Sequence, residues 1–397
     1  MSASPELFGE LQPPQRVLLG PGPSNVHPRV MRAMQLPVIG YLDPDLLQIM
    51  DQVAAMLRQV FRTRNSVTFA VPGTGSAGME TGIANLLEPD DVAVIGANGF
   101  FSERIAEMVT RQGARPIMVP AEWGSPVDPG DLERELKRHA NKVKLLAVVH
   151  AETSTGVLQP MQDISRLARK YNALLLVDAV TSLGGCSVEV ESWEADFVYS
   201  ATQKCLGCPP GLSPITASDA AVNVIRERKS KTRTWYLDLS LLENYWSGPR
   251  RYHHTTPVTL LYALHEGLRV VLDEGLEQRF VRHERNAEAL RRGLEALGLK
   301  LLVAPPYRLN QLTPVFIPDG IDDQTFRQAL LREFNIEIGG GLGKLRGQIW
   351  RIGLMGESSQ VAYVLSLLTA LETLLPRFGY EVARGEGVAS AAKALAC

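Results

Sequence analysis

One stretch decides the fold: KLLAVVHAETSTGVLQPMQDISRLARKYNALLLVDAV, residues 144–180. Residues 144–151 and 173–180 are almost continuously apolar, which predicts strands that are buried on both faces. Residues 163–172 repeat apolar side chains with a helical period, which predicts a helix between the two strands. A strand, a helix and a strand in this order form a β-α-β unit, whose strands lie parallel in one sheet.

The same alternation continues on both sides of this stretch. Further strands are predicted at residues 66–71, 91–97, 115–120 and 195–204, and helices at residues 45–61, 76–87, 102–113 and 128–140. This order predicts an α/β fold with a mainly parallel sheet between layers of helices. Ligands of such sheets bind at the carboxyl ends of the strands. The places to look for chemistry are therefore the loops that follow Val71, Ala97, Ala151, Val177 and Tyr199.

The pattern changes after residue 278. Long helices are predicted at residues 258–275, 279–296 and 360–378, a shorter one at 325–334, and strands within 300–318 and 348–356. We therefore predict an N-terminal arm at 1–16, a large domain at 17–278, a smaller C-terminal α+β domain at 279–380 and a fraying tail at 381–397.

Composition excludes several classes of protein. The 397 residues include 41 Lys and Arg against 43 Asp and Glu, so no bulk charge attracts nucleic acid or anionic lipid. Four cysteines are too few for a disulfide scaffold. No apolar run is expected to approach the roughly 18 residues that span a bilayer. We expect a cytoplasmic protein with no nucleic-acid or membrane partner.

A glycine-rich turn, Gly73-Thr74-Gly75-Ser76-Ala77-Gly78, follows one predicted strand and opens a helix. Free N–H groups at such a helix start favour a phosphate, although a plain structural turn has the same composition. The G-x-G-x-x-G spacing also occurs in dinucleotide-binding folds. The next strand, residues 91–97, ends without the acid that holds a ribose hydroxyl in those folds. A nicotinamide-dependent oxidoreductase therefore stays only as a remote alternative.

Asp178 and Lys204 end two other predicted strands. An aspartate is disfavoured within strands and costly to bury unpaired, so Asp178 predicts either a ligand partner or a cap of the next turn. Lys204 lies between an apolar strand and CLGCPPG, where a lysine is less solvated than on an ordinary loop. A lysine, a carboxylate and a phosphate-binding helix end are the groups that pyridoxal 5′-phosphate requires.

With these residues in place, the sequence resembles the class V aminotransferases of fold type I, and in particular the alanine–glyoxylate and serine–glyoxylate (serine–pyruvate) aminotransferases. The resemblance covers roughly residues 17–378. It rests on LLGPGPSN (18–25), PGTGSAGME (72–80), GANGFFSER (96–104), ETSTGVLQP (152–160), LLLVDAVTSLGG (174–185), YSATQKCLGCPPG (199–211), RYHHTTP (251–257), GGLG (340–343) and RIGLMG (351–356). It implies a large domain with a mainly parallel seven-stranded sheet, a smaller C-terminal α+β domain and pyridoxal 5′-phosphate as cofactor.

The resemblance also implies roles for matched residues. Lys204 would form the Schiff base with the cofactor and move the proton, and Asp178 would pair with the ring nitrogen. The remaining cofactor-binding residues would be Thr74, Gly75, Ser76 and Gln203 at the phosphate, Thr153 beside the ring hydroxyl, Phe101 stacked on the ring, and Tyr252 and Thr255 at the phosphate of the neighbouring subunit. Gly22 would line the substrate pocket and Arg351 would clamp the substrate carboxylate, in a homodimer with shared sites.

The implied activity is transfer of an amino group from alanine or serine to glyoxylate, giving glycine and a 2-keto acid. Ureidoglycine–glyoxylate, serine–pyruvate, hydroxykynurenine and pyridoxamine–pyruvate transaminases share the pattern, so the donor stays open. Tyr41 and Asp43 lie in a variable segment expected to touch substrate. A cysteine desulfurase is disfavoured, because no cysteine lies between Cys208 and Cys397.

Two further pairs invite a functional interpretation that we do not adopt. Cys205 and Cys208 follow the lysine, but the prolines after them replace the helix start of a thioredoxin-like site. His253 and His254 are adjacent, so their side chains are expected on opposite faces of an extended segment, packing rather than binding metal. No metal site is predicted.

Overall fold

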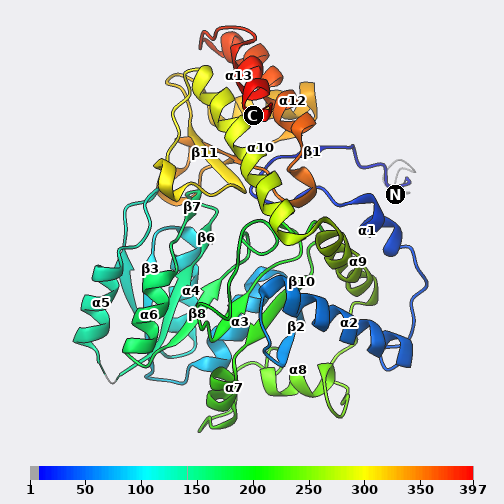
Figure 1. Cartoon of the computed structure of the whole chain (residues 1–397), viewed down its shortest axis with the longest axis vertical. Helices are drawn as coiled ribbons and strands as arrows, with labels where there is room; N and C mark the ends of the chain where they lie inside the picture. The colour runs from blue at the N-terminus through cyan, green and yellow to red at the C-terminus, as the bar shows by residue number, and fades with distance from the viewer. Residues whose placement is uncertain (1–8, 141, 397) are drawn as a thin grey trace, which may run out of the picture.

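The structure, a computed structural model, describes residues 9–140 and 142–396 (Figure 1). Its main feature is a seven-stranded sheet with the order β2-β10-β9-β8-β5-β3-β4. In this order the strands are Val67–Pro72, Leu212–Ala217, Phe197–Tyr199, Leu174–Asp178, Val143–Val149, Val92–Ala97 and Arg115–Pro120. Within this described sheet only β10 runs antiparallel to its neighbours, which confirms the mainly parallel sheet.

Strand β10 was not predicted, and it contains Pro214, a residue that is disfavoured in the interior of a sheet. The structure shows why the proline is tolerated. The carbonyl of Pro214 accepts a hydrogen bond from Ser200, which lies beyond the end of β9 at Tyr199. The ring nitrogen faces the same side, where the neighbouring strand has ended, so its missing N–H removes no bond from the ladder.

Helices bury the sheet from both sides, and β2, β3 and β10 are buried at every residue. Six of the helices that pack on the strands are α2 (Pro44–Phe61), α3 (Gly75–Leu86), α4 (Phe100–Arg111), α5 (Pro129–Arg138), α6 (Gln162–Lys170) and α9 (Val258–Glu274). All six were predicted. The short helices α1 (Pro28–Ala33), α7 (Asp219–Arg226) and α8 (Leu239–Trp246) and the hairpin of β6 (Ala151–Glu152) and β7 (Val157–Leu158) were not.

A second core lies above the sheet in Figure 1, around a three-stranded sheet of β11 (Leu312–Phe316), β14 (Ile349–Gly353) and β13 (Gly339–Gly340). Its helices are α10 (Leu276–Ala296), α11 (Asp323–Phe334), α12 (Val361–Leu374) and α13 (Glu386–Leu395). Strand β1 (Val17–Leu18) pairs with β12 (Ile336–Glu337) and brings Leu19 into this core. The domain boundaries given above stay a prediction, and residues 17–19 pack with the smaller unit.

Two predictions about the C-terminal region are wrong. The expected fraying tail contains α13, which packs on α10 and buries Ala391 completely. One segment of the described chain, Val361–Phe378, is long and apolar enough to cross a membrane by length and composition, and 44% of it is buried. That segment is α12 and the turn after it, and its residues Leu367 and Leu371 are fully buried in the second core.

Candidate active site

A cavity of about 290 Å³ opens at the carboxyl edge of the large sheet. Its lining residues come from the loops after five strands and from the helices that follow them. They are Thr74, Gly75, Ser76, Met79, Phe101, Arg104, Val149, Ala151, Thr153, Asp178, Val180, Thr181, Gln203 and Lys204. The structure thus gathers eight of the predicted site residues around one cavity.

One end of the cavity is the start of α3. Thr74 is the N-cap residue, but its side chain makes no capping hydrogen bond. The first N–H groups of a helix have no partner within the helix, so they face the cavity as donors for an anion. Gly75 lets this helix start pack closely on the neighbouring loops, because a Cβ there would lie 3.0 Å from Val180 and 3.1 Å from Ala201. This end suits a phosphate group.

Arg104 adds a positive charge at the same end, and the sequence analysis missed it. Its Nη1 donates to Ser76 Oγ at 3.1 Å, and its guanidinium lies 5.1 Å from the Phe101 ring centroid. A signal was present in the sequence. Arginine near the start of a helix opposes the helix dipole, so a basic residue in the second turn after GANGFF indicates a nearby anion.

Asp178 forms the floor of the cavity at the end of β8 and is 3% exposed. Its Oδ1 accepts the Val180 N–H at 2.8 Å and its Oδ2 accepts the Tyr199 hydroxyl at 2.7 Å. Burial nevertheless raises the pKa of Asp178 to about 6, because these bonds do not replace the lost hydration. The ionised carboxylate therefore gains most from a cationic N–H donor in the cavity.

Lys204 projects into the cavity from the loop after β9. Its Nζ donates to the carbonyl of Pro21, and Gly22 is packed so close that a Cβ there would lie 2.4 Å from Nζ. Burial lowers the pKa of Lys204 to about 8, and the charge of Arg351 acts in the same direction. A neutral amine is the nucleophilic and proton-accepting form, so near neutral pH this lysine is partly in its reactive state.

Glu152 is a buried acid beside the cavity that the sequence analysis also missed. Its carboxylate accepts the N–H and hydroxyl of Ser154 at 3.0 and 2.6 Å and the N–H of Phe101 at 3.2 Å. It thereby caps α4 and fixes the position of the Phe101 ring. Burial raises the pKa of Glu152 to about 7. An acid directly after the apolar run 144–151 was the same signal that identified Asp178.

Arg351 lies beside the cavity and is 6% exposed. Its Nε donates to Gly340 O at 2.7 Å and its Nη1 donates to Thr153 O at 3.0 Å. Burial lowers its pKa to about 10, so it stays charged at physiological pH. Its Nη2 has no hydrogen-bond partner among the residues that the structure describes, which leaves one guanidinium edge for a carboxylate.

Tyr252 and Thr255 do not line the cavity of their own chain. Both are exposed, and their hydroxyls lie 3.5 Å apart. The Tyr252 ring contacts that of Tyr41, with centroids 4.7 Å apart. Asp43 caps α2 by accepting the N–H of Asp45, which is a structural role. A site residue that points to solvent within one chain is what a shared site between two subunits requires.

Neither of the two pairs set aside above lines the cavity. His253 and His254 do not point to opposite faces: their Nδ1 atoms lie 2.9 Å apart, and Trp235 stacks on His253. The backbone bends here instead of running as a strand, so the alternation rule does not apply. Cys205 and Cys208 are buried, and burial raises their pKa values to about 11 and 12, away from the reactive thiolate.

The donor set fits pyridoxal 5′-phosphate. The uncapped helix start and Arg104 can hold the phosphate. Asp178 lines the cavity, and because burial disfavours its ionised form, it would gain from a protonated ring nitrogen as a partner. The buried Oε1 of Gln203 has no partner within the described chain, so this amide is also available to a ligand. A half-buried lysine, a buried carboxylate and a phosphate-binding helix end in an α/β sheet define a pyridoxal-phosphate-dependent enzyme.

Comparison with known proteins gives the family. Residues 17–345 match the sequence profile of the family described as Aminotransferase class-V. The chain is 42% identical to ureidoglycine–glyoxylate aminotransferase from Bacillus subtilis, whose crystal structure covers 98% of this chain and 100% of its own with a TM-score of 0.96. It is also 42% identical to alanine–glyoxylate aminotransferase from Oryctolagus cuniculus, over 91% of this chain and 93% of that protein. A crystal structure of alanine–glyoxylate aminotransferase from Nostoc sp. is 46% identical, with a TM-score of 0.90 over 94% of this chain and 100% of its own.

The chain therefore belongs to the class V aminotransferases. It is an aminotransferase whose cofactor is pyridoxal 5′-phosphate. The sheet also argues against the remote alternative, a nicotinamide-dependent oxidoreductase. Gly78 serves packing against β10, since a Cβ there would lie 2.1 Å from Ser213 Oγ, and β10 runs antiparallel beside β2 where a dinucleotide fold has a parallel neighbour.

Proposed function

We propose that this aminotransferase moves the amino group of a small amino acid, alanine or serine, to glyoxylate and forms glycine. The observation that carries the proposal is the size of the cavity with Arg351 beside it. About 290 Å³ lies just below the roughly 300–1,000 Å³ of typical ligand pockets, and cofactor and substrate have to share this space. The relatives from B. subtilis, O. cuniculus and Nostoc all carry glyoxylate in their names.

The residues of this chain have separate tasks in the proposed reaction. The bound cofactor supplies an electron sink for the charge that develops at the substrate Cα. Lys204 takes the proton from that carbon and returns it to the cofactor, which its lowered pKa favours. Asp178 holds a proton on the ring nitrogen by its negative charge. Arg351 orients the substrate through its carboxylate, which places the Cα–H bond near Lys204.

We further propose a homodimer in which Tyr252 and Thr255 complete the phosphate site of the partner subunit. Both side chains point away from their own cavity, and large apolar residues are exposed on the same chain: Leu36, Val38, Tyr41, Leu42, Trp235 and Tyr236. Burying such side chains is the usual driving force for a stable subunit interface. A cytoplasmic location stays part of this proposal and would be tested by cell fractionation.

The amino donor is tested by adding L-alanine, L-serine or L-ureidoglycine separately to the purified yellow enzyme. We expect alanine or serine to bleach the visible absorbance of the bound cofactor and glyoxylate to restore it. Bleaching by ureidoglycine alone would replace the proposed donor with that of the B. subtilis relative. A yellow protein that no small amino acid bleaches would require a bulkier amine and would contradict the proposal.

A further inference from the structure

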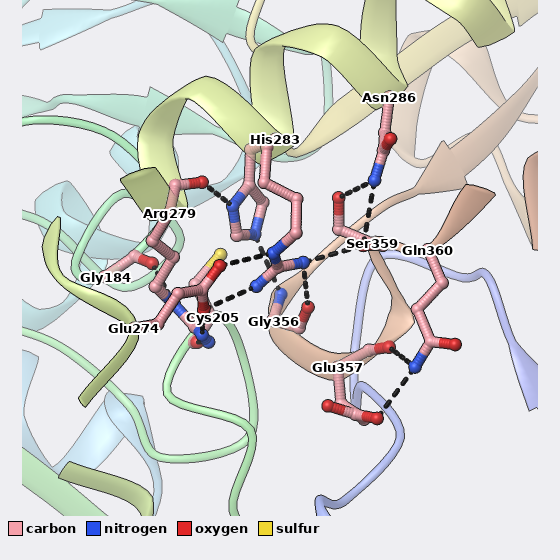
Figure 2. Close-up of polar contacts among 11 residues, drawn as sticks. Gly184, Cys205, Glu274, Arg279, His283, Asn286, Gly356, Glu357, Ser359 and Gln360 are labelled. Carbon is pink, nitrogen blue, oxygen red and sulfur yellow. Dashed lines mark hydrogen bonds and ion pairs between the residues drawn. The ribbon is translucent and has the colours of Figure 1, made fainter. Parts of the chain in front are cut away.

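A buried arginine lies behind the catalytic loops, on the first turn of α10 (Figure 2). Arg279 is 3% exposed, and each part of its guanidinium is bonded. Its Nε donates to Gly184 O at 2.8 Å, its Nη2 donates to Cys205 O at 2.6 Å, and its Nη1 pairs with Glu274. One side chain from the small unit therefore contacts two separate loops of the large sheet.

Those two loops are the ones that carry the reacting groups. Gly184 belongs to the loop that follows β8 and Asp178, whereas Cys205 is the residue after Lys204. The planar guanidinium fork fixes both carbonyls relative to one another, which the single ammonium of a lysine cannot do. The position of the lysine loop relative to the aspartate loop is thus set in part by Arg279.

The same helix also holds the lysine loop from its other side. His283 Nε2 accepts the N–H of Gly356 at 3.0 Å, and its Nδ1–H donates to Arg279 O at 2.7 Å (Figure 2). Gly356 is pressed against this loop, since a Cβ there would lie 2.9 Å from Cys205 O and 3.2 Å from Lys204 O. The loop is therefore confined between α10 and the 356–358 turn.

Two titratable groups next to Arg279, the Glu274 carboxylate and the His283 imidazole, each keep one charge state near neutral pH. Burial alone would raise the pKa of Glu274, but hydrogen bonds from Arg282 and the charge of Arg279 lower it to about 2. His283 is neutral, because burial lowers its pKa to about 3. Neither Glu274 nor His283 therefore changes its charge between pH 5 and 9.

We propose that Arg279 is a positioning residue for amino transfer: it holds the backbone of the Lys204 loop against the Asp178 loop and so sets where the lysine amine meets the cofactor. The inference rests on the roles of Lys204 and Asp178 given above and is independent of the amino donor. Arg279 does not line the cavity, so it acts on the reaction through the carbonyls of Cys205 and Gly184.

The chain offers a matched control on the same helix. Arg291 is 6% exposed and likewise donates from α10 to a backbone carbonyl, Leu309 O, at 2.8 Å, and to Asn310 Oδ1 at 3.0 Å. These partners carry no site residue. Replacing either arginine removes a buried cation and leaves buried oxygens unpaired, so both changes are expected to lower stability, that of Arg279 by more because it also pairs with Glu274.

The experiment compares Arg279→Lys and Arg279→Met with Arg291→Lys and Arg291→Met in the cofactor-loaded enzyme. The visible absorbance of the bound cofactor is titrated with pH, and kcat and KM are measured beside thermal unfolding. We expect both Arg279 variants to shift the absorbance titration and lower kcat by roughly 10- to 100-fold with a smaller change in KM. The Arg291 variants should unfold at lower temperature with the titration and kcat unchanged.

The outcomes distinguish a failure of the positioning role of Arg279 from a failure of the proposed glyoxylate activity. Arg279 variants whose titration and kcat match those of the Arg291 variants would overturn the positioning role. If Arg279→Met does not fold, Arg279→Lys decides, because it keeps the charge beside Glu274 and loses the fork. The absorbance titration needs only bound cofactor, so it reports on Arg279 even if glyoxylate proves to be the wrong acceptor.

Discussion

The floor of the cavity and the segment 252–255 differ in how complete they are within one chain. On the floor, Asp178 is buried and Lys204 is half-buried, and both are hydrogen-bonded and shifted in pKa. In the segment, Tyr252 and Thr255 are exposed and reach nothing in their own cavity. The side of the site that holds the cofactor ring is thus built by one fold, whereas part of the phosphate side requires a second subunit in our proposal.

The two regions also differ in the free-energy cost that each carries when no cofactor is bound. Burying the charged groups of Asp178 and Lys204 without a ligand is unfavourable, and a bound cofactor relieves that cost. The exposed segment 252–255 carries little such cost when no cofactor is bound. Substitutions on the floor should therefore change chemistry and stability in opposite directions, and those in the segment should mainly change cofactor affinity. The following predictions test this contrast in order of expected size.

The largest effect is expected at Lys204. In Lys204→Ala the amine that moves the proton is gone, so turnover should fall by about 10⁴-fold or more. The folded cavity is retained, so the variant should still bind the cofactor phosphate, which equilibrium dialysis would measure. Near-normal turnover in this variant would contradict the assignment of the cavity as the active site.

Asp178→Asn tests whether the floor stores unfavourable energy. Because the pKa of Asp178 is raised by folding from 3.8 to about 6, the folded protein binds the extra proton, and stability falls as pH rises through that interval. Keeping the carboxylate ionised at pH 8 costs about 3 kcal/mol. Without cofactor, the amide variant should therefore be more stable than the parent at pH 8 by up to that amount and equal at pH 4.

Adding cofactor should reverse this order, because only the carboxylate gains a charged partner on the ring. The measurement is chemical denaturation at pH 4 and pH 8, with and without pyridoxal 5′-phosphate, and turnover of the variant should fall by about 100-fold. Equal stabilities of the two cofactor-free proteins at pH 8 would show that Asp178 is adequately solvated by its own bonds.

Arg351→Lys asks whether guanidinium geometry matters for the substrate. The lysine keeps the charge but cannot bond Gly340, Thr153 and a carboxylate together. Losing a charge-assisted pair of bonds should raise KM for the amino acid by roughly 10- to 100-fold with a smaller change in kcat. A simple amine without a carboxylate is the control substrate, and its rate should be equally low in both enzymes.

Periodicity predicted most of the fold because it reports burial directly. Six strands and six packing helices of the large unit followed from apolar patterns. What failed depends on neighbours: β10 tolerates Pro214 because β9 ends beside it, and α13 is ordered by its contact with α10. No local pattern states where an adjacent strand ends or which helix covers a tail.

The site was predicted where motif and strand end coincide. Asp178, Lys204 and the turn at Gly75 each follow an apolar strand, so the sheet brings them together. Arg104 and Glu152 were missed because one lies inside a helix and the other is next to a residue already given a role. That Tyr252 and Thr255 face away from their own cavity could be expected only from the family resemblance, since one chain cannot display a shared site.

The smallest effect is expected for Tyr252→Phe, which removes one hydroxyl from the proposed shared phosphate site. One hydrogen bond to a charged group is worth about 1.5 kcal/mol, so cofactor affinity should weaken by about tenfold.

Mixing this variant with Lys204→Ala subunits distinguishes the two possible arrangements, in which Tyr252 serves either its own site or that of the partner subunit. If Tyr252 serves the partner, each mixed dimer regains one normal site, because Lys204 of the first chain meets the intact tyrosine of the second. If it serves its own chain, no normal site forms and tight cofactor binding with turnover is not restored. At a cofactor concentration that fills the parent sites but not those of Tyr252→Phe, recovery of up to half the parent activity in mixed dimers would therefore establish the contrast between a floor built by one chain and a phosphate side built by two.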